Sequence, residues 1–415
     1  MDETQQAIFQ TGTDVGMLAR DLFPGGVDAS PVDYFHYQQS VADTQKYIQE
    51  GRKVIYEAAF QFNGLLCAVD VLAKKNGKWY AYEVKSTTSV KPPMLQDAAF
   101  QYYVITNAGL ALQDFYIVHL NNQYIRQGAL ELKKLFKAES VLTEVLGLQS
   151  FITSKESELK ALLKSKDLPL IEVGVQCNNP YPCDFYGFCS KDLVEEEPDY
   201  GEAYINKEAI SDFLNQLQYP LYHIDFESWM TAVPEYDGHW PYRQVCFQYS
   251  VHIQKTAGAE PEHYAYLASG TNSPTLEFLE NLLKVLDKNG TVLVYNKAFE
   301  NTRFKELKQE HPQHGKAVDK ILDRVVDLMS PFRSHYRLPE MQGSFSIKYV
   351  LPALVSELSY NGLVIGNGGD ASAAFFNLRN ETDSEKIKST REALLEYCKL
   401  DTLAMVKILE KLNSI

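Results

Sequence analysis

The sequence predicts an α/β protein of two domains, and three observations support this. The chain has 415 residues, which at about 100–200 residues per domain suggests more than one domain. Apolar, β-favouring runs alternate with helical periodicity in both halves. Between the halves, the charged stretch Glu195–Pro198 has little to bury and stops a helix. We therefore expect domains at 1–192 and 217–415, joined by a linker at 193–216.

The composition narrows the class of protein. Hydrophobic residues make up 45% and charged residues 23%, as in ordinary globular proteins. The start is acidic and polar, and no apolar run approaches the roughly 20 residues of a membrane span. Six cysteines are too few for a disulfide scaffold, so we expect a cytoplasmic protein with no membrane partner. The net charge, 40 − 54 = −14, argues against holding nucleic acid by bulk charge.

The first half reads as a mixed α/β unit. The Asn76-Gly77 dipeptide is a strong hairpin signal, so the two strands around it are expected to be antiparallel neighbours. The expected elements are helices at 5–22 and 40–51, strands at 54–62, 65–73 and 79–85, a helix at 96–107, a strand at 115–121 and a long helix at 141–164.

Two acids and a lysine converge on this hairpin. Glu83 and Lys85 alternate on one strand and so share a face, and the hairpin brings Asp70 beside them. Isolated charges at the end of an apolar sheet are costly. The carboxylates can hold Mg²⁺ or Mn²⁺, and the metal with the lysine can activate a water and stabilise charge on a phosphate. The pattern predicts metal-assisted phosphodiester hydrolysis; the alternative is a salt-bridged surface hairpin.

The spacing D-x12-E-x-K resembles the PD-(D/E)XK nucleases, specifically the RecB-like exonuclease branch. The resemblance implies a restriction-endonuclease-like fold for 1–192. In that resemblance the two carboxylates ligate the metal together with the Val84 carbonyl, and the lysine orients the water. Gln101 on the following helix matches the family's helical Gln, and Glu57 matches more loosely an acid on its first core strand. The family's upstream metal-binding His has no counterpart, which leaves one ligand open.

Three cysteines form a C-x5-C-x5-C cluster before the linker: Cys177, Cys183 and Cys189. Such a loop can surround one metal ion or cluster. RecB-like nucleases of the CRISPR-associated type close this domain with a 4Fe–4S cluster that uses three late cysteines and one upstream, and these three resemble the late group. Residues 1–50 contain no cysteine, so an N-terminal segment precedes this sequence, the site is degenerate, or Cys67 substitutes. Zinc and unrelated thiols are the alternatives.

The second half carries a second set of acids. Asp225 and Glu227 end its first strand, Glu300 lies at a strand–helix junction, and Asp401 follows Tyr397 by one turn of the last helix. Four such acids repel one another unless cations neutralise them, and two metals about 4 Å apart can stabilise both oxygens of a phosphodiester displacement. The expected elements are strands at 221–226, 245–254 and 292–295 and helices at 275–286, 300–310 and 384–412.

These three segments resemble the DnaQ-like, RNase H-fold exonucleases of the DEDD group. The D-x-E pair matches the first motif, and Asn296-x-x-Phe299-Glu300 matches the second, with Glu where the family usually has Asp. Tyr397-x3-Asp401 matches the third, in which the Tyr hydroxyl positions the attacking water. Each motif is common alone, but all three in order are rarer. The resemblance implies an RNase H-like domain at 217–415 that cuts 3′→5′ with Mg²⁺ or Mn²⁺.

Together the two halves resemble a bacterial family known only as a domain of unknown function. The expected function is a metal-dependent exonuclease acting on nucleic acid, DNA rather than RNA, in repair or defence. The alternative is a nucleic-acid-binding or scaffold protein with degenerate sites, which Glu300 and the unidentified fourth cysteine favour and Lys85 and Tyr397 oppose. Cations at the acids would reverse the local field, so the net charge does not exclude a nucleic-acid partner.

Overall fold

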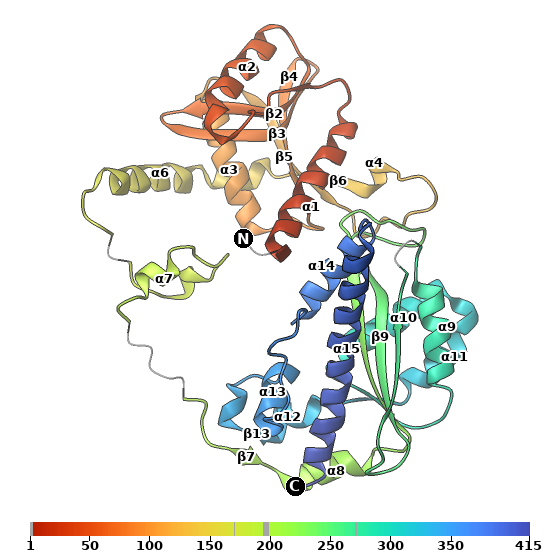
Figure 1. Ribbon diagram of the computed structural model, residues 1–415. Helices are drawn as coiled ribbons and strands as arrows, with labels where there is room; N and C mark the ends of the chain where they lie inside the picture. The colour runs from red at the N-terminus through yellow and green to blue at the C-terminus, as the bar shows by residue number, and fades with distance from the viewer. Residues whose placement is uncertain (1–2, 170, 194–198, 270–271) are drawn as a thin grey trace. The chain divides into compact units, whose positions relative to one another are not determined.

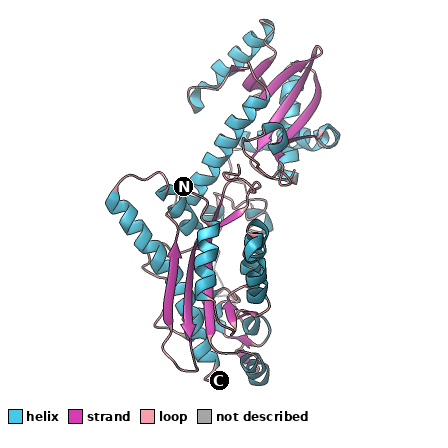
Figure 2. Cartoon of the chain, turned by 90° about the vertical axis from the view of Figure 1, so that its right-hand side faces the viewer, coloured by secondary structure: helices cyan, strands magenta, loops and turns pink. Residues whose placement is uncertain are grey.

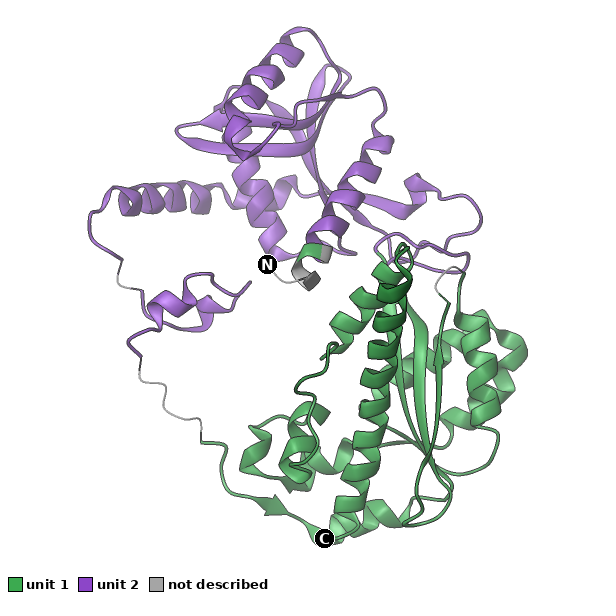
Figure 3. Cartoon of the chain, viewed as in Figure 1, with its two compact units in different colours: residues 1–7, 196–231, 243–415 green, residues 8–195, 232–242 purple. Residues whose placement is uncertain are grey.

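The computed structural model describes residues 3–169, 171–193, 199–269 and 272–415. The chain divides into two compact units (Figures 1 and 3). Unit 1 comprises Met1–Ala7, Glu196–Thr231 and Arg243–Ile415, and unit 2 comprises Ile8–Glu195 and Ala232–Tyr242. Each unit has its own sheet with helices packed on it, which confirms the α/β prediction. Among the described residues, no helix combines the length and apolar character that a membrane span requires.

Unit 2 is built on a six-stranded sheet in the order β1-β2-β3-β4-β5-β6. Strands β2, β3 and β4 form an antiparallel meander, β5 is parallel to β4, and β6 is antiparallel to β5. The N-terminal elements are α1 (Glu3–Ala19), β1 (Val27–Asp28), α2 (Tyr37–Gln49), β2 (Val54–Phe62), β3 (Leu65–Lys75), β4 (Lys78–Lys85), α3 (Pro92–Asn107), β5 (Leu112–Leu120), α4 (Leu132–Leu135), β6 (Phe136–Ser140), α5 (Leu142–Gly147), α6 (Gln149–Lys164) and α7 (Tyr186–Cys189).

The predicted hairpin is present between β3 and β4. Asn76 and Gly77 have φ of 50° and 77°, as a two-residue primed turn requires, and Lys75 pairs with Lys78 across it. Helix α3 then crosses from β4 to the parallel β5, so the carboxyl ends of these two strands meet at one edge of the sheet. That edge carries Lys85.

Two details of unit 2 differ from expectation. The long helix expected at 141–164 is two helices, α5 and α6, separated at Leu148, because Gly147 is a poor helix former. Lys133 and Lys137 have the i, i+4 spacing of one helix face, but Lys137 lies on strand β6. Pairing with the backbone of β5 outweighs the local helical preference there.

Unit 1 is built on a five-stranded sheet in the order β10-β9-β8-β11-β12, in which β8–β10 are antiparallel and β8, β11 and β12 parallel. Its elements are β7 (Tyr204–Ile205), α8 (Lys207–Asn215), β8 (Leu221–Met230), β9 (Gln244–Gln254), β10 (Glu262–Leu267), α9 (Thr275–Val285), β11 (Val292–Val294), α10 (Lys297–Glu310), α11 (Gly315–Leu322), β12 (Val325–Asp327), α12 (Ser330–Ser334), β13 (Tyr336–Arg337), α13 (Ile347–Leu354), α14 (Gly368–Leu378) and α15 (Ser384–Leu412).

Helices cover both faces of this sheet. On one face, Tyr222, Ile224 and Phe226 of β8 pack with buried residues of α9, α10 and α11. On the other face, the long helix α15 runs beside β8 and β9 (Figures 1 and 2). Because side chains alternate along a strand, Asp225 and Glu227 point to the α15 face.

The predicted linker at 193–216 is wrong for part of its length. Residues 207–215 form helix α8, whose Ile210 and Phe213 are buried in the core cluster that contains Leu221 and Leu409. An amphipathic helix that buries its apolar face belongs to the folded unit. Residues 194–198 of the linker lie outside the described residues.

The segment Ala232–Tyr242, between β8 and β9, clusters with unit 2 (Figure 3).

Candidate functional site

The second acid cluster comprises Asp225, Glu227, Glu300 and Asp401, all within unit 1. Strand β8 supplies the first two. The parallel neighbour β11, with Leu293 opposite His223, leads into α10, which carries Glu300 in its first turn. Helix α15, the last helix of the chain, supplies Asp401. The topology therefore brings together four acids that span 176 positions of the chain (401 − 225).

Helix α15 is anchored to β9 by buried polar contacts. The Thr402 hydroxyl lies 2.7 Å from Ser250 Oγ and 2.8 Å from His252 Nδ1. About two turns earlier, Gln248 Nε2 donates to the Leu394 carbonyl at 2.7 Å. These contacts set the rotation and the translation of the helix on the sheet, and so place Asp401 over β8.

Thr402→Val tests this anchor. The substitution removes the partner of His252 Nδ1 and leaves Ser250 Oγ with His263 Nε2 at 2.9 Å, so we expect a loss of about 1–3 kcal/mol in unfolding free energy and a lower Tm. We also expect weaker Mn²⁺ binding, because the helix that carries Asp401 is less well fixed. Thermal denaturation and titration calorimetry measure the two effects. Thr302→Val, at an exposed position of α10, is the matched control and should change little; equal Tm values for the two variants would contradict the anchor.

Three potential ligand atoms converge at the centre of the cluster. Those of Asp225, Glu227 and Cys398 lie within 4.8 Å of one another. The Cys398 thiol donates to Asp225 Oδ2 at 3.7 Å, and burial raises the pKa of this thiol. Cys398 is fully buried, as an ordinary core cysteine is, and it also borders the acids. Its position directly after Tyr397, a residue of the third motif, was the sequence signal that it lies near the acids.

The acids are held close together with little compensating charge. Burial, and then repulsion by Asp401, raises the pKa of Glu227 to about 8, and burial raises that of Glu300 to about 8. Burial also raises the pKa of Asp401 to about 6. For Asp225, burial followed by repulsion from the other three holds the pKa well above its ordinary value. Such a site takes up protons or cations.

Glu300 lies deeper than the other acids. Its side chain is 2% exposed, and Oε2 has no hydrogen-bond partner among the described residues. The sharp entry into α10 positions it: Asn296 has φ of 78°, and its N–H donates to Asp327 Oδ1 at 3.0 Å. Asp327 also accepts from the Met329 N–H, so it holds the turn.

Two residues that the sequence did not single out border the same acids. The Tyr360 hydroxyl donates to Asp401 Oδ1 at 2.6 Å. Lys348 Nζ donates to the Gly366 carbonyl at 2.7 Å and lies 5.7 and 5.8 Å from the ring centroids of Tyr360 and Tyr397. Neither stands at a motif spacing from the acids, so only the tertiary structure reveals them.

A cavity of about 250 Å³ opens beside these groups. It is lined by Asp225, Glu227, Tyr295, Phe299, Lys348, Gly368, Tyr397, Asp401 and neighbouring apolar residues. Its wall therefore combines carboxylates, one ammonium group and two phenols around a space open to a small ligand. Helix α14 begins at this wall, and a Cβ on Gly368 would lie 3.5 Å from Glu227 Oε2, so the backbone passes close to the acid.

The first acid cluster, Glu57, Asp70 and Glu83, lies in unit 2. Tyr56 of β2 pairs with Val71 of β3, and Val71 pairs with Tyr82 of β4. Each acid is the sequence neighbour of one of these paired residues, so the three acids lie side by side on neighbouring strands. The Val84 N–H donates to Asp70 Oδ2 at 2.6 Å. Burial and then Glu83 raise the pKa of Asp70, and burial raises that of Glu83.

Lys85 projects into the first acid cluster. Its Nζ donates to Glu83 Oε1 at 2.9 Å and to Asp97 Oδ2 at 2.7 Å. Burial opposes the charge, but the two carboxylates prevail and raise the pKa of Lys85. Asp97 was not predicted as a site residue, although it lies one helical turn before Gln101, and Gln101 Nε2 donates to its Oδ1 at 3.4 Å. That i, i+4 spacing on α3 was the available signal.

Glu57 differs from the other two acids of this cluster. Its φ of 50° is rare for a residue with a side chain, and Ile55 and Ala58 consequently face the same core cluster although they are three apart. Arg20 Nη2 lies 3.0 Å from Glu57 Oε1. Unlike Asp225, Glu227 and Cys398 of unit 1, these three acids form no group of ligand atoms within 4.8 Å in the described part of the chain.

The three late cysteines lie close in sequence and differ in exposure. Cys177 is buried, Cys183 is exposed and Cys189 is intermediate, and the Cys183 N–H donates to the Cys177 carbonyl at 2.8 Å. Within the described ranges the three thiols do not form a ligand group within 4.8 Å. Cys67 packs in the core of unit 2, with its sulfur 3.9 Å from the Gln101 carbonyl. An iron–sulfur or zinc site at the late cysteines stays a prediction.

Comparisons with known proteins found similarity over part of the chain. Residues 222–346 match a family described as "Domain of unknown function (DUF2779)". The curated "Uncharacterized protein UU173" of Ureaplasma parvum serovar 3 is 27% identical over 227 residues, which cover 48% of this chain and 32% of that protein. The chain thus spans about a third of that relative's length. No solved structure matches. The similarity is to an uncharacterised domain family, and the matched residues include Asp225, Glu227 and Glu300.

Proposed function

We propose that the protein is a metal-dependent exonuclease that removes nucleotides from the 3′ end of nucleic acid at the second acid cluster. The observation that supports this most is the set of four buried carboxylates with raised pKa values beside a cavity of about 250 Å³. A set of carboxylate oxygens suits hard divalent cations such as Mg²⁺ or Mn²⁺. Uncompensated buried acids also fit a site whose charge is completed by cations.

The side chains have distinct proposed roles. Asp225, Glu227 and Asp401 would hold the cations, with Glu300 as the deeper acid. When bound, such cations supply Lewis acidity and a water of lowered pKa. The Tyr397 hydroxyl, at the cavity wall, would hold the attacking water by a hydrogen bond. Tyr360 fixes the orientation of Asp401 through its 2.6 Å hydrogen bond.

The assay that tests the proposal uses the full chain with oligonucleotides labelled at the 5′ end. With Mg²⁺ or Mn²⁺, we expect products that shorten one nucleotide at a time from the 3′ end, and none with EDTA. Parallel DNA and RNA substrates, single- and double-stranded, identify the preferred class. An absence of cleavage with all substrates and both metals would contradict the proposal and favour the alternative of a non-catalytic binding protein.

Lys348 provides a second test, because it is the ammonium group in the cavity wall. We propose that it contacts the phosphate while it offsets the charge of Glu227 and Asp401, whose pKa values it lowers. Lys348→Met should reduce kcat by about 10²-fold, as loss of one electrostatic contact does elsewhere, without weakening Mn²⁺ binding, because the change removes a positive charge beside the carboxylates. Lys407→Met, at an exposed position of α15, is the control. Wild-type kcat in Lys348→Met would rule out this role.

A second candidate activity belongs to the first acid cluster. The row of acids on three strands, with Lys85 between Glu83 and Asp97, supports a RecB-like nuclease site. Asp70 and Glu83 would hold the cation, and the Lys85 ammonium would orient a water or the phosphate. Cleavage that persists in Asp225→Asn and disappears on adding Asp70→Asn would assign this activity.

A further inference from the structure

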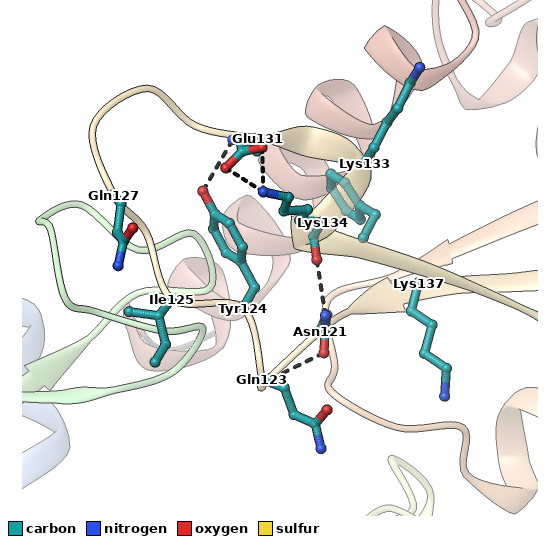
Figure 4. A pocket seen from close by; sticks show the side chains of 10 residues that line it. Asn121, Gln123, Tyr124, Ile125, Gln127, Glu131, Lys133, Lys134 and Lys137 are labelled. Atoms are coloured by element: carbon teal, nitrogen blue, oxygen red, sulfur yellow. Dashed lines mark hydrogen bonds and ion pairs between the residues drawn. The ribbon is translucent and has the colours of Figure 1, made fainter.

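A second cavity lies in unit 2, outside both acid clusters (Figure 4). Its volume is about 500 Å³, and its walls are the chain that leaves β5, helix α4 and the start of β6. The side chains that matter here are three amides and three lysines: Asn121, Gln123, Gln127, Lys133, Lys134 and Lys137.

The cavity is locally basic in an acidic chain. Three lysines against one glutamate, Glu131, give 3 − 1 = +2, whereas the whole chain carries −14. Lys134 pairs with Glu131 at 2.8 Å, and Lys137 approaches Glu139 only at 3.5 Å. Lys133 has no ion-pair partner among the described residues. Amide and ammonium groups are hydrogen-bond donors, so this wall favours an anion with several oxygens.

The strand register connects this cavity to the first acid cluster. Lys85 of β4 is paired with His119 of β5, and His119 is paired with Lys137 of β6. Paired residues point to the same face, and neighbouring strands lie about 4.8 Å apart, so the backbones at the two lysines are about 10 Å apart. That distance spans at most about three nucleotides, because 3.4 Å is the rise per nucleotide of a stacked helix and an extended strand is longer per nucleotide.

We propose that this cavity binds the phosphates of a single nucleic-acid strand whose next phosphates lie at the first acid cluster. The inference deepens, and rests on, the nuclease activity proposed for that cluster. A sphere of 500 Å³ is about 10 Å across, less than the roughly 12 Å major groove of a duplex, so one strand fits and a duplex does not. Backbone phosphates are the ligand; DNA and RNA both supply them.

The test separates binding from cleavage. The full chain carrying Asp70→Asn and Asp225→Asn, in EDTA, is titrated into a fluorescent 30-nucleotide strand of DNA or RNA, and anisotropy gives Kd at several salt concentrations. Adding Lys133→Gln and Lys137→Gln should raise Kd about five- to tenfold. Removing two phosphate contacts from a single strand should also reduce the slope of log K against log salt by about 1.4.

Lys46→Gln with Lys78→Gln is the matched control, because both lysines are exposed and belong to unit 2. Lys46 and Lys137 are 64% and 61% exposed, and each is near one glutamate. Kd and slope equal to those of the control would overturn the inference, as would a duplex bound more tightly than either strand. We expect inorganic phosphate to displace the strand only weakly, because several phosphates of the strand bind together. Cleavage assays on the parent chain fail or succeed independently of this result.

Discussion

Asp225→Asn is expected to reduce 3′→5′ cleavage by about 10²–10³-fold, the size of effect seen when one electrostatic contact is lost from an active site. The amide keeps the shape of the side chain and removes the charge that would hold a cation. Mn²⁺ binding measured by titration calorimetry should weaken in parallel. Cleavage of 5′-labelled strands by wild type and variant gives the ratio of rates.

The same substitution should stabilise the metal-free protein at pH 8. Asp225 is repelled by Asp401, Glu227 and Glu300, and a neutral amide removes this repulsion. A variant that is inactive but has a raised Tm cannot owe its inactivity to misfolding. Asp212→Asn, at an exposed position of α8, is the control and should match wild type in both measurements. Full activity in Asp225→Asn, or a lowered Tm, would contradict the proposed role.

The metal-free protein is expected to lose stability as the pH rises from about 6.5 to about 8. Glu227 and Glu300 have pKa values raised from 4.5 to about 8 in the folded protein. Between these values the folded state holds protons that the unfolded state has released, so unfolding becomes more favourable with each pH unit. Two groups over 1.5 pH units give roughly 4 kcal/mol at about 1.4 kcal/mol per pKa unit, or about 10 °C in Tm.

Two buried histidines have the opposite effect on stability as the pH rises, but they act below the pH range of 6.5 to 8. Burial lowers the pKa of His223 to about 4 and that of His252 to about 3, from 6.5. They add stability as the pH rises towards 6.5 and nothing above it, because both states are then neutral. Scans from pH 6.5 to 8.5 in EDTA therefore report mainly the acids.

Saturating Mg²⁺ or Mn²⁺ should abolish most of this pH dependence. Bound cations favour the ionised carboxylates, so the folded state no longer holds the extra protons. Glu227→Gln with Glu300→Gln should flatten the metal-free profile in the same way. A metal-free Tm that is constant or rises between pH 6.5 and 8 would show that these acids are not held protonated.

Local sequence predicted much of each cluster. The Asn76-Gly77 turn implied the hairpin that brings Asp70 beside Glu83, because its left-handed backbone suits a two-residue connection. Alternation along β8 implied that Asp225 and Glu227 share a face, and one helical turn relates Tyr397 to Asp401. These relations involve neighbours in sequence, for which spacing determines direction.

Residues that enter a site from elsewhere in the chain were not predicted. Lys348 and Tyr360 stand at no recognisable spacing from the acids they border. Asp97, which contacts Lys85, was signalled only by its spacing from Gln101, and Cys398 only by its place beside Tyr397. The strand at 136–140 was missed because its pairing with β5, a long-range contact, outweighs local preference.

The sequence by itself determined the class of fold and which neighbouring acids of each cluster share a face, because strand and helix periods specify the directions of nearby side chains. The tertiary structure decided which distant residues complete each cluster and where helix α15 rests on β9 through Thr402. It also placed Lys137 in register with Lys85. Packing and register between elements depend on contacts across the whole unit, and no local pattern carries that information.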